Sequence, residues 1–289
     1  MKKLLIIIIL FPFFCQAQKL LFLQDNVKGQ MDFVKKNRLE VYKLINQSQF
    51  VTNDQLDEEK LRKEVIRRFP NTSSSGYAVL DWEGKAMDAL ISQKDEGTFK
   101  MYIGEFVRAL KIAKKLRPNV KWGFYALPYR QYWNINDTFR NKNYRLVEIL
   151  KNQDFIEPSL YTFYPEAVSR KSNSEYIHKN ISLALELGRK YNKPVYAFIW
   201  HRVHPSNKKY SEEQIPLSVF EEEIAQMLSS YNGYKISGLM WWHSENYSCL
   251  NRSKSRVYAK EYEDISDANS YQRAIFQRYF DSIKKYLDK

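Results

Sequence analysis

The chain has 289 residues, a formal net charge of +13, and 44% hydrophobic and 15% aromatic residues, which is enough apolar material for a packed core. Its two cysteines, Cys15 and Cys249, exclude a framework of several disulfides. The positive charge has two interpretations: solubility from a lysine-rich composition, or attraction to a polyanion such as nucleic acid, an anionic surface or an acidic glycan.

Residues 1–17 have the pattern of an export signal, with two lysines, an apolar run at 4–14 and the small residue Ala17 before a cleavage point. The run is too short for a comfortable membrane span. We expect cleavage after Ala17 and a secreted or periplasmic mature chain of residues 18–289. A lipid anchor at Cys15 is the less favoured alternative, because no small residues precede it. Export disfavours a nucleic-acid partner, and no later segment is apolar for long enough to span a membrane.

Short apolar runs then alternate with helical patterns along the mature chain. The runs predict strands at residues 19–24, 77–80, 122–127, 159–163, 194–200 and 236–242. Apolar residues at helical spacing predict helices around residues 102–113, ended by Pro118, and at 177–191, 214–228 and 270–286. Strands separated by helices indicate parallel β/α units, and six of them favour a TIM-like (β/α) barrel in a single domain over an open doubly wound sheet.

Polar and aromatic residues follow the predicted strands, where the active sites of such barrels lie. The residues at these positions are Asp81, Trp82, Glu83, Tyr125, Pro128, Tyr129, Tyr132, Tyr161, Tyr164, Trp200, His201, Trp241, Trp242 and His243. Two carboxylates among tyrosine and tryptophan rings indicate a carbohydrate cleft, because sugar rings stack on flat apolar faces. Tyr125 and Tyr129 are therefore candidate substrate-binding residues.

The Asp81-Trp82-Glu83 triplet has a specific geometric meaning. Residues i and i+2 of a strand face the same way, so Asp81 and Glu83 project together while Trp82 turns into the packing. Two neighbouring carboxylates cannot both ionise freely, and the group whose pKa is raised can serve as a general acid. However, they lie too close together to flank a glycosidic bond. The arrangement better fits Glu83 protonating the leaving oxygen while Asp81 orients a 2-acetamido group of the substrate, whose oxygen attacks. Surface solvation or a helix cap is the alternative interpretation.

Five blocks in order resemble the animal and venom hyaluronidase family of glycoside hydrolases. The sequence GYAVLDWE at 76–83 is similar to the family's catalytic strand, with Ala-Val-Ile-Asp-Trp-Glu. Similar blocks follow: AKKLRPN and KWGFY within 113–125, PSLY at 158–161, PVYAF at 194–198 and SGLMWW at 237–242. The resemblance implies a distorted (β/α) barrel and a retaining, substrate-assisted endo-β-N-acetylhexosaminidase acting on an acidic polysaccharide, hyaluronan or chondroitin.

By position, the resemblance assigns Glu83 as the acid/base and Asp81 as the partner of the acetamido group. It also assigns Tyr161 to a contact with that group and Trp242 to the pocket wall. Trp200 falls near the place of another pocket tyrosine. The chain departs from the family's pattern in four ways. GKAM follows Glu83 where the family has Trp-Arg-Pro, and YRQY at 129–132 replaces a cysteine-containing loop. The family disulfides and a C-terminal cysteine-rich module are absent.

These departures leave the polysaccharide open. The alternatives are another N-acetylated glycan, such as a peptidoglycan or chitin-like chain, and a non-catalytic glycan-binding barrel. A strongly basic cleft would favour glucuronate-containing substrates, whereas a neutral cleft would favour the others. His201, His204 and His243 have loose spacing for metal ligands, so we expect no metal or other cofactor. Nothing in the sequence specifies an oligomeric state.

Overall fold

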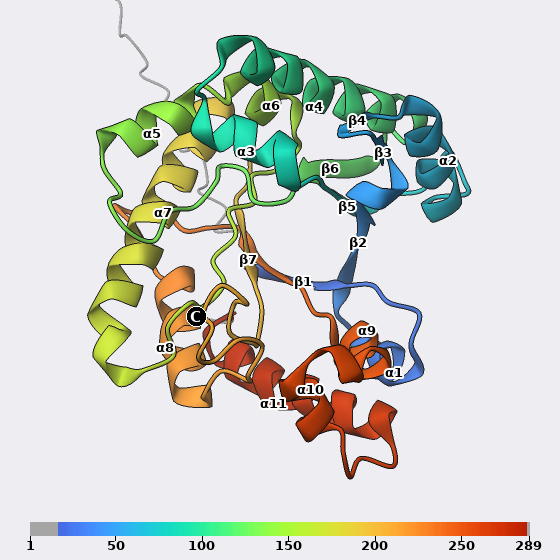
Figure 1. The fold of residues 1–289 in the computed structure, drawn as a ribbon, viewed down its shortest axis with the longest axis vertical. Helices are drawn as coiled ribbons and strands as arrows, with labels where there is room; N and C mark the ends of the chain where they lie inside the picture. Colours follow the sequence, from blue (N-terminus) through green and yellow to red (C-terminus); the bar gives the residue numbers. More distant parts are fainter. Residues whose placement is uncertain (1–16, 288–289) are drawn as a thin grey trace, which may run out of the picture.

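The computed structural model describes residues 17–287, and within this range six parallel strands form one curved sheet in the order β6-β5-β2-β1-β8-β7 (Figure 1). These strands are β1 (Lys19–Leu23), β2 (Glu40–Asn46), β5 (Gly76–Asp81), β6 (Val120–Phe124), β7 (Tyr196–Ile199) and β8 (Gly238–Trp241). Two short strands, β3 (Val51–Thr52) and β4 (Gln55–Leu56), form a separate hairpin. The expected export signal lies outside the described residues, apart from Ala17.

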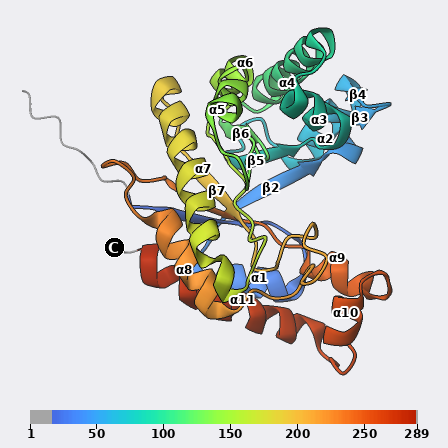
Figure 2. The ribbon, with the colours of Figure 1, turned by 60° about the vertical axis from the view of Figure 1, so that its left-hand side comes forward.

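Most of the helices cover the outer face of this sheet, and the two short helices between residues 245 and 261 lie beside it (Figure 2). The helices are α1 (Lys28–Asn37), α2 (Glu58–Arg68), α3 (Gly84–Ser92), α4 (Glu96–Leu116), α5 (Asp137–Tyr144), α6 (Val147–Asn152), α7 (Arg170–Tyr191), α8 (Leu217–Leu228), α9 (Glu245–Leu250), α10 (Arg256–Glu261) and α11 (Ala268–Leu287). Neighbours in the ring pack together, with α2 against α4, α4 against α6, α7 against α8, α8 against α11 and α11 against α1. No helix of the described range is long and apolar enough to cross a bilayer.

An irregular segment, residues 154–160, completes the barrel between β6 and β7. The Asp154 backbone N–H donates to the Trp122 carbonyl at 2.8 Å on one side. On the other side, Ile156 and Ser159 form parallel bridges to Val195 and Phe198. The predicted regular strand at 159–163 is therefore wrong beyond Ser159. Pro158 within the segment has no N–H to donate to a ladder, and the chain leaves the sheet after Leu160, whose N–H donates to the Phe198 carbonyl at 2.9 Å.

Alternation along the strands produces two cores. Leu21, Tyr42, Val79, Phe198 and Met240 fill the barrel interior. Their strand neighbours face outward and pack against the helices; they include Phe22, Ile45, Leu80, Trp122, Phe124, Ile199 and Trp241. Strands buried on both faces read as continuous apolar runs, which is why the sequence revealed most of them.

The predicted (β/α) barrel is confirmed, and its distortion lies in the irregular closure. The four predicted helices correspond to α4, α7, α8 and α11, although α8 begins only at Leu217, after Pro216. The third predicted strand ends at Phe124 rather than Leu127, because the chain turns there into the loop over the cleft. Strand β2 was not predicted, since Glu40 and Lys43 interrupt its apolar pattern. Whether residues 18–289 form a single domain stays a prediction.

Candidate active site

The carboxyl ends of the barrel strands open into a cleft with a volume of about 510 Å³. Its size lies within the range typical of ligand pockets. The cleft is lined by Asp25, Leu44, Asn46, Asp81, Glu83, Tyr125, Tyr161, Trp200, His204, Pro205, Glu212, Trp242, His243, Ser244, Tyr247 and Ser248. Of the seven candidate residues from the sequence, the cleft brings six together: Asp81, Glu83, Tyr125, Tyr161, Trp200 and Trp242.

Packing of Trp82 fixes the direction of the two carboxylates. Its ring is 2% exposed and stacks on Phe106 with centroids 4.9 Å apart, as predicted for a residue turned away from the site. Asp81 ends β5, and Glu83 precedes the first residue of α3. The Glu83 side chain makes no capping hydrogen bond with that helix. Both acid side chains are thus available to the cleft rather than to the local backbone.

Local contacts hold this strand end in place. The Glu83 backbone N–H donates to Gln47 Oε1 at 3.0 Å. Asn46, which ends the neighbouring strand β2, donates its side-chain amide to Asp81 Oδ2 at 3.4 Å. The other Asp81 oxygen, Oδ1, is buried and has no hydrogen-bond partner among the described residues. One carboxylate oxygen is therefore held from the side, and the second is left without a fixed donor.

Both carboxyl groups are held toward their protonated forms. Burial, followed by the charge of Glu83, raises the pKa of Asp81 to about 7. Glu83 is exposed at the cleft mouth, yet desolvation by the surrounding walls raises the pKa of its carboxyl, and the Arg130 guanidinium acts in the opposite direction. Raised carboxyl pKa values in a cleft are the condition for general acid chemistry near neutral pH.

Aromatic rings form one wall of the cleft. Trp200 and Trp242, which directly follow β7 and β8, meet edge to face with centroids 4.8 Å apart. The Tyr161 ring lies 5.9 Å from the Trp200 ring and 6.0 Å from the Trp242 ring. Tyr125 extends the wall, with its hydroxyl 3.1 Å from Ser159 Oγ. Such a wall offers flat apolar faces with polar edges, which suits a sugar ring.

Tyr129 does not line this cleft, and its neighbour Arg130 was missed by the sequence analysis. Tyr129 packs edge to face on Phe139, at 5.5 Å between centroids, in the core under the helices. The Arg130 guanidinium instead donates to His204 Nε2 at 3.0 Å and lies 5.7 Å from the Tyr161 ring centroid. The rule that strand ends carry the site therefore led to a loop in which Tyr129 lies in the core, while Arg130 contacts Tyr161 and His204 of the cleft lining.

The histidines of the site serve as neutral hydrogen-bonding groups. Burial lowers the pKa of both His204 and His243 to about 4. His243 Nε2 donates to the Leu23 carbonyl at 3.2 Å, which leaves its buried Nδ1 as an acceptor. His201 lies apart, buried against Trp241 and Glu245. Among the described residues, no three His, Cys, Asp or Glu side chains converge as metal ligands.

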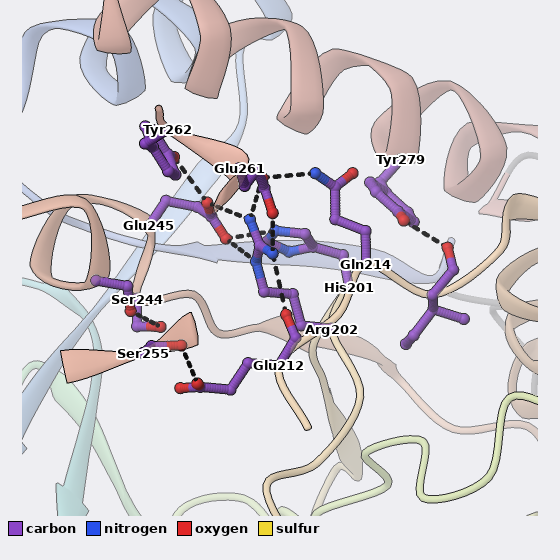
Figure 3. Close-up of polar contacts among 12 residues, drawn as sticks. His201, Arg202, Glu212, Gln214, Ser244, Glu245, Ser255, Glu261, Tyr262 and Tyr279 are labelled. Carbon is purple, nitrogen blue, oxygen red and sulfur yellow. Dashed lines mark hydrogen bonds and ion pairs between the residues drawn. The ribbon is translucent and has the colours of Figure 1, made fainter. Parts of the chain in front are cut away.

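A buried ion-pair network supports the wall that carries Trp242 (Figure 3). Arg202, in the loop after β7, donates to both carboxylate oxygens of Glu245 at 2.5 and 2.8 Å, and to Glu261 of α10 at 2.8 Å. His201 Nε2 lies 2.9 Å from Glu245 Oε1, and the Tyr262 hydroxyl donates to Oε2 at 3.1 Å. Glu245 follows Ser244 directly, so this network fixes the loop that lines the cleft.

The lining of the cleft is acidic although the chain is basic. Of its sixteen described lining residues, four are carboxylic acids and none is lysine or arginine. The acids are Asp25, Asp81, Glu83 and Glu212. The Arg130 guanidinium is not part of this lining, but its charge acts to lower the pKa of Glu83. The positive charge of the chain is therefore not concentrated in this cleft.

Curated proteins with similar sequences are hyaluronidases. "Hyaluronidase Tab y 2.0101" of Tabanus yao is 24% identical over 199 residues, which cover 56% of this chain and 56% of that protein. A hyaluronidase of Polybia paulista is 30% identical over 87 residues, covering 28% of this chain and 29% of that protein. The matches span about half or less of these relatives. No protein-family model matches the chain.

Solved structures give the same result at the level of the fold. Bee venom hyaluronidase has a TM-score of 0.61 at 15% identity, covering 84% of this chain and 97% of that one. Its complex with a hyaluronic acid tetramer has a TM-score of 0.59 at 14% identity, covering 86% of this chain and all of the other. The predicted resemblance is confirmed: the chain is similar to hyaluronidases in sequence and shares the fold of bee venom hyaluronidase.

Proposed function

We propose that this chain is an exported glycoside hydrolase that cuts β-N-acetylhexosaminide bonds within a polysaccharide, with retention of configuration. The observation that carries the proposal is the position of Asp81, which ends β5, and Glu83, which follows it before α3; both line a cleft with an aromatic wall. The names of the similar proteins support a glycan as substrate. The pattern of residues 1–17 supports export.

Glu83 acts first as the acid. It donates its proton to the glycosidic oxygen as the bond to the anomeric carbon breaks, and the acetamido oxygen of the substrate attacks that carbon. The product is a cyclic oxazolinium ion on the sugar. Asp81, as a carboxylate, accepts the acetamido N–H and balances the positive charge. Water then attacks the anomeric carbon and gives its proton to Glu83, so two displacements retain the configuration.

Hyaluronan or chondroitin is the first candidate substrate. Both curated relatives are named hyaluronidases, and one similar structure holds a hyaluronic acid tetramer. The net charge of +13 also favours capture of an acidic polymer by the molecule as a whole. Repeating N-acetylhexosamine units in these polymers supply the acetamido group that the mechanism requires.

A neutral N-acetylated glycan, such as a chitin-like chain, is the second candidate. A uronate carboxylate bound against the cleft lining would meet four acidic residues and no lysine or arginine of the described lining. Those of the four that are ionised repel a uronate carboxylate at short range, which disfavours its binding. A neutral chain of N-acetylhexosamine units avoids this repulsion and retains the acetamido nucleophile. The acidity of the cleft is the specific observation that favours this candidate.

The test is a size analysis of hyaluronan, chondroitin and a neutral N-acetylglucosamine oligomer after incubation with the parent protein and with Glu83→Gln. Glu59→Gln, on the exposed face of α2, is the matched control. We expect the parent and the control to shorten one of the substrates, leaving saturated ends. Glu83→Gln should bind that substrate but turn it over about 10²–10⁴-fold more slowly, because a positioned acid contributes that much.

The substrate that is shortened decides between the two candidates. Equal turnover by Glu83→Gln would contradict the assignment of the acid. Unsaturated product ends would indicate a lyase instead of a hydrolase. Binding by the parent without shortening of any polymer would favour a non-catalytic glycan-binding barrel.

A further inference from the structure

The side chain of Glu157 lies in the barrel interior, below the cleft. Glu157 belongs to the irregular segment 154–160, and its backbone N–H donates to the Leu127 carbonyl at 3.1 Å. The residue is fully buried, and neither carboxyl oxygen has a hydrogen-bond partner among the described residues. A buried acid without a partner is costly, so its presence requires an explanation.

The barrel provides a specific space for this carboxyl group. Trp122 and Phe124 of β6 pack against the helices, so Gly123 between them faces the interior. A Cβ atom at Gly123 would lie 2.2 Å from Glu157 Oε1 and 2.7 Å from the Phe155 ring. Even a methyl group at position 123 would displace the acid. The missing side chain on β6 is therefore what accommodates Glu157.

Two further unpartnered oxygens face the same interior. The Tyr42 hydroxyl on β2 and Asp81 Oδ1 at the end of β5 are both buried without a partner. Glu157 and Asp81 both act on Tyr42, and burial followed by the charge of Asp81 raises the pKa of Glu157 well above its usual value. The side chains of Tyr42, Asp81 and Glu157 thus form one polar cluster in the barrel interior.

The other titratable groups around this cluster do not offset its negative charge. Tyr125 after β6 and Glu83 at the cleft mouth act on its members, and the Tyr161 hydroxyl faces Tyr42 and Tyr125. Arg130 acts on Glu83 and the tyrosines, but no cation of the described range acts on Glu157 or Asp81. Two buried carboxyl groups without a cation can carry only one negative charge between them.

We propose that Glu157 is a positioning residue for Asp81: it remains protonated in the barrel interior and shares its proton with Asp81 through hydrogen bonds that include the Tyr42 hydroxyl. The single negative charge then resides on Asp81, the carboxyl that faces the cleft. No direct hydrogen bond joins the two acids, so the proposed chain of hydrogen bonds requires a bridging group, such as an interior water, between them. The inference rests on the proposed function, in which Asp81 must meet the acetamido group as a carboxylate.

The first test measures the melting temperature (Tm) from pH 4 to pH 8 for the parent, Glu157→Gln, and Glu148→Gln as an exposed control on α6. The folded-state pKa of Glu157 is raised, so the parent keeps full stability below pH ~4.5 and loses stability as the pH rises toward the folded pKa. Glutamine does not titrate. We expect the Tm of Glu157→Gln minus the Tm of the parent to increase as the pH rises. The same difference for the Glu148→Gln control should not change with pH. A constant difference, or a loss that grows with pH, would overturn the proposal.

The second test measures coupling without any turnover. Asp81→Asn, Glu157→Gln and the double variant form a cycle with the parent, and Tm is compared at each pH. Groups that share a proton give non-additive changes that depend on pH. Additive changes at every pH would show that the two acids are independent and would reject the proposal. This result does not depend on the proposed function.

The third test uses the acid limb of the pH profile of kcat/KM on a substrate that the parent shortens. Glu157→Gln replaces one neutral donor by another and should keep the limb at the parent's position. Glu157→Leu removes the donor and should move the limb upward by about one pH unit, since a hydrogen bond to a carboxylate lowers its pKa. A decrease in kcat/KM by the same factor at all pH values in Glu157→Leu would indicate that Glu157 has only a packing role. A downward shift in Glu157→Gln would mean that Glu157 is charged. Either result contradicts the proposal.

Discussion

Burial raises the pKa of Asp81 to about 7, so near neutral pH the folded protein binds a proton that the unfolded chain has lost. Proton binding of this kind reduces stability as the pH rises from the unfolded pKa of about 4 toward the folded value. Above pH 7 the cost reaches its limit. In the proposed function, this cost follows from burying Asp81 at the place where its carboxylate must accept the substrate's acetamido N–H.

Asp81→Asn should therefore be more stable and less active than the parent. The increase in the free energy of unfolding should be absent near pH 4, grow up to pH 7 and then remain constant. Its upper limit is about 4 kcal/mol for the shift in the pKa of Asp81. Thermal unfolding at pH 4 and pH 8 measures it, with Asp88→Asn on the exposed face of α3 as the control. A lower Tm for Asp81→Asn at pH 8 than at pH 4, relative to the parent, would contradict the assigned protonation.

The loop after β8 and helix α9 depend on the buried pair of Arg202 and Glu245. Although burial alone would raise the pKa of Glu245, Arg202 and His201 lower it well below its usual range. A lowered folded pKa gives stability that is present above the unfolded pKa and lost as the pH falls toward the folded one. The network thus contributes most at neutral pH, where it holds Ser244 and Tyr247 at the cleft.

Glu245→Gln should destabilise the protein by about 3–5 kcal/mol at pH 7, because it leaves Arg202 with one carboxylate instead of two in a buried site. The loss should shrink below pH 4.5. Chemical unfolding at pH 7 and pH 4 measures it, and protection of α9 and α10 from hydrogen exchange should fall first. Glu263→Gln, which is exposed after α10, is the control. Equal stability of Glu245→Gln and the parent at pH 7 would contradict this role.

Sequence patterns predicted the elements that follow regular periods. Apolar runs identified β1, β5 and β8, and the Asp81-Trp82-Glu83 triplet placed two carboxylates at one strand end because strand geometry is local. Long-range contacts were not visible in this way. Arg202 pairs with Glu245 across 43 positions, and the charge of Asp81 acts on Glu157 only because the barrel closes. Arg130 was missed for a local reason, the direction in which its loop residue points.

At the scale of the whole molecule, charge and site have opposite signs. The chain carries +13, yet the described lining of the cleft holds four acids and no lysine or arginine. Overall positive charge governs encounter with a polyanion, whereas the lining governs what binds at the reacting bond. The overall positive charge favours the acidic polysaccharide as substrate, whereas the acidic lining favours the neutral N-acetylated glycan.

The geometry of the site leads to one stereochemical result. Asp81 ends β5 and Glu83 follows two residues later, so the two carboxylates are too close together to stand on opposite faces of a sugar and activate a water for direct attack. In the proposed function, the substrate's own acetamido group is therefore the nucleophile, and the sugar keeps its β configuration whichever N-acetylated glycan is the substrate.

The most direct measurement is the anomeric configuration of the first product, followed by proton NMR during the initial turnovers of the substrate that the parent shortens. We predict that the β-anomer appears first and then converts slowly to the equilibrium mixture. Initial release of the α-anomer would contradict the substrate-assisted mechanism and the roles of Asp81 and Glu83 within it.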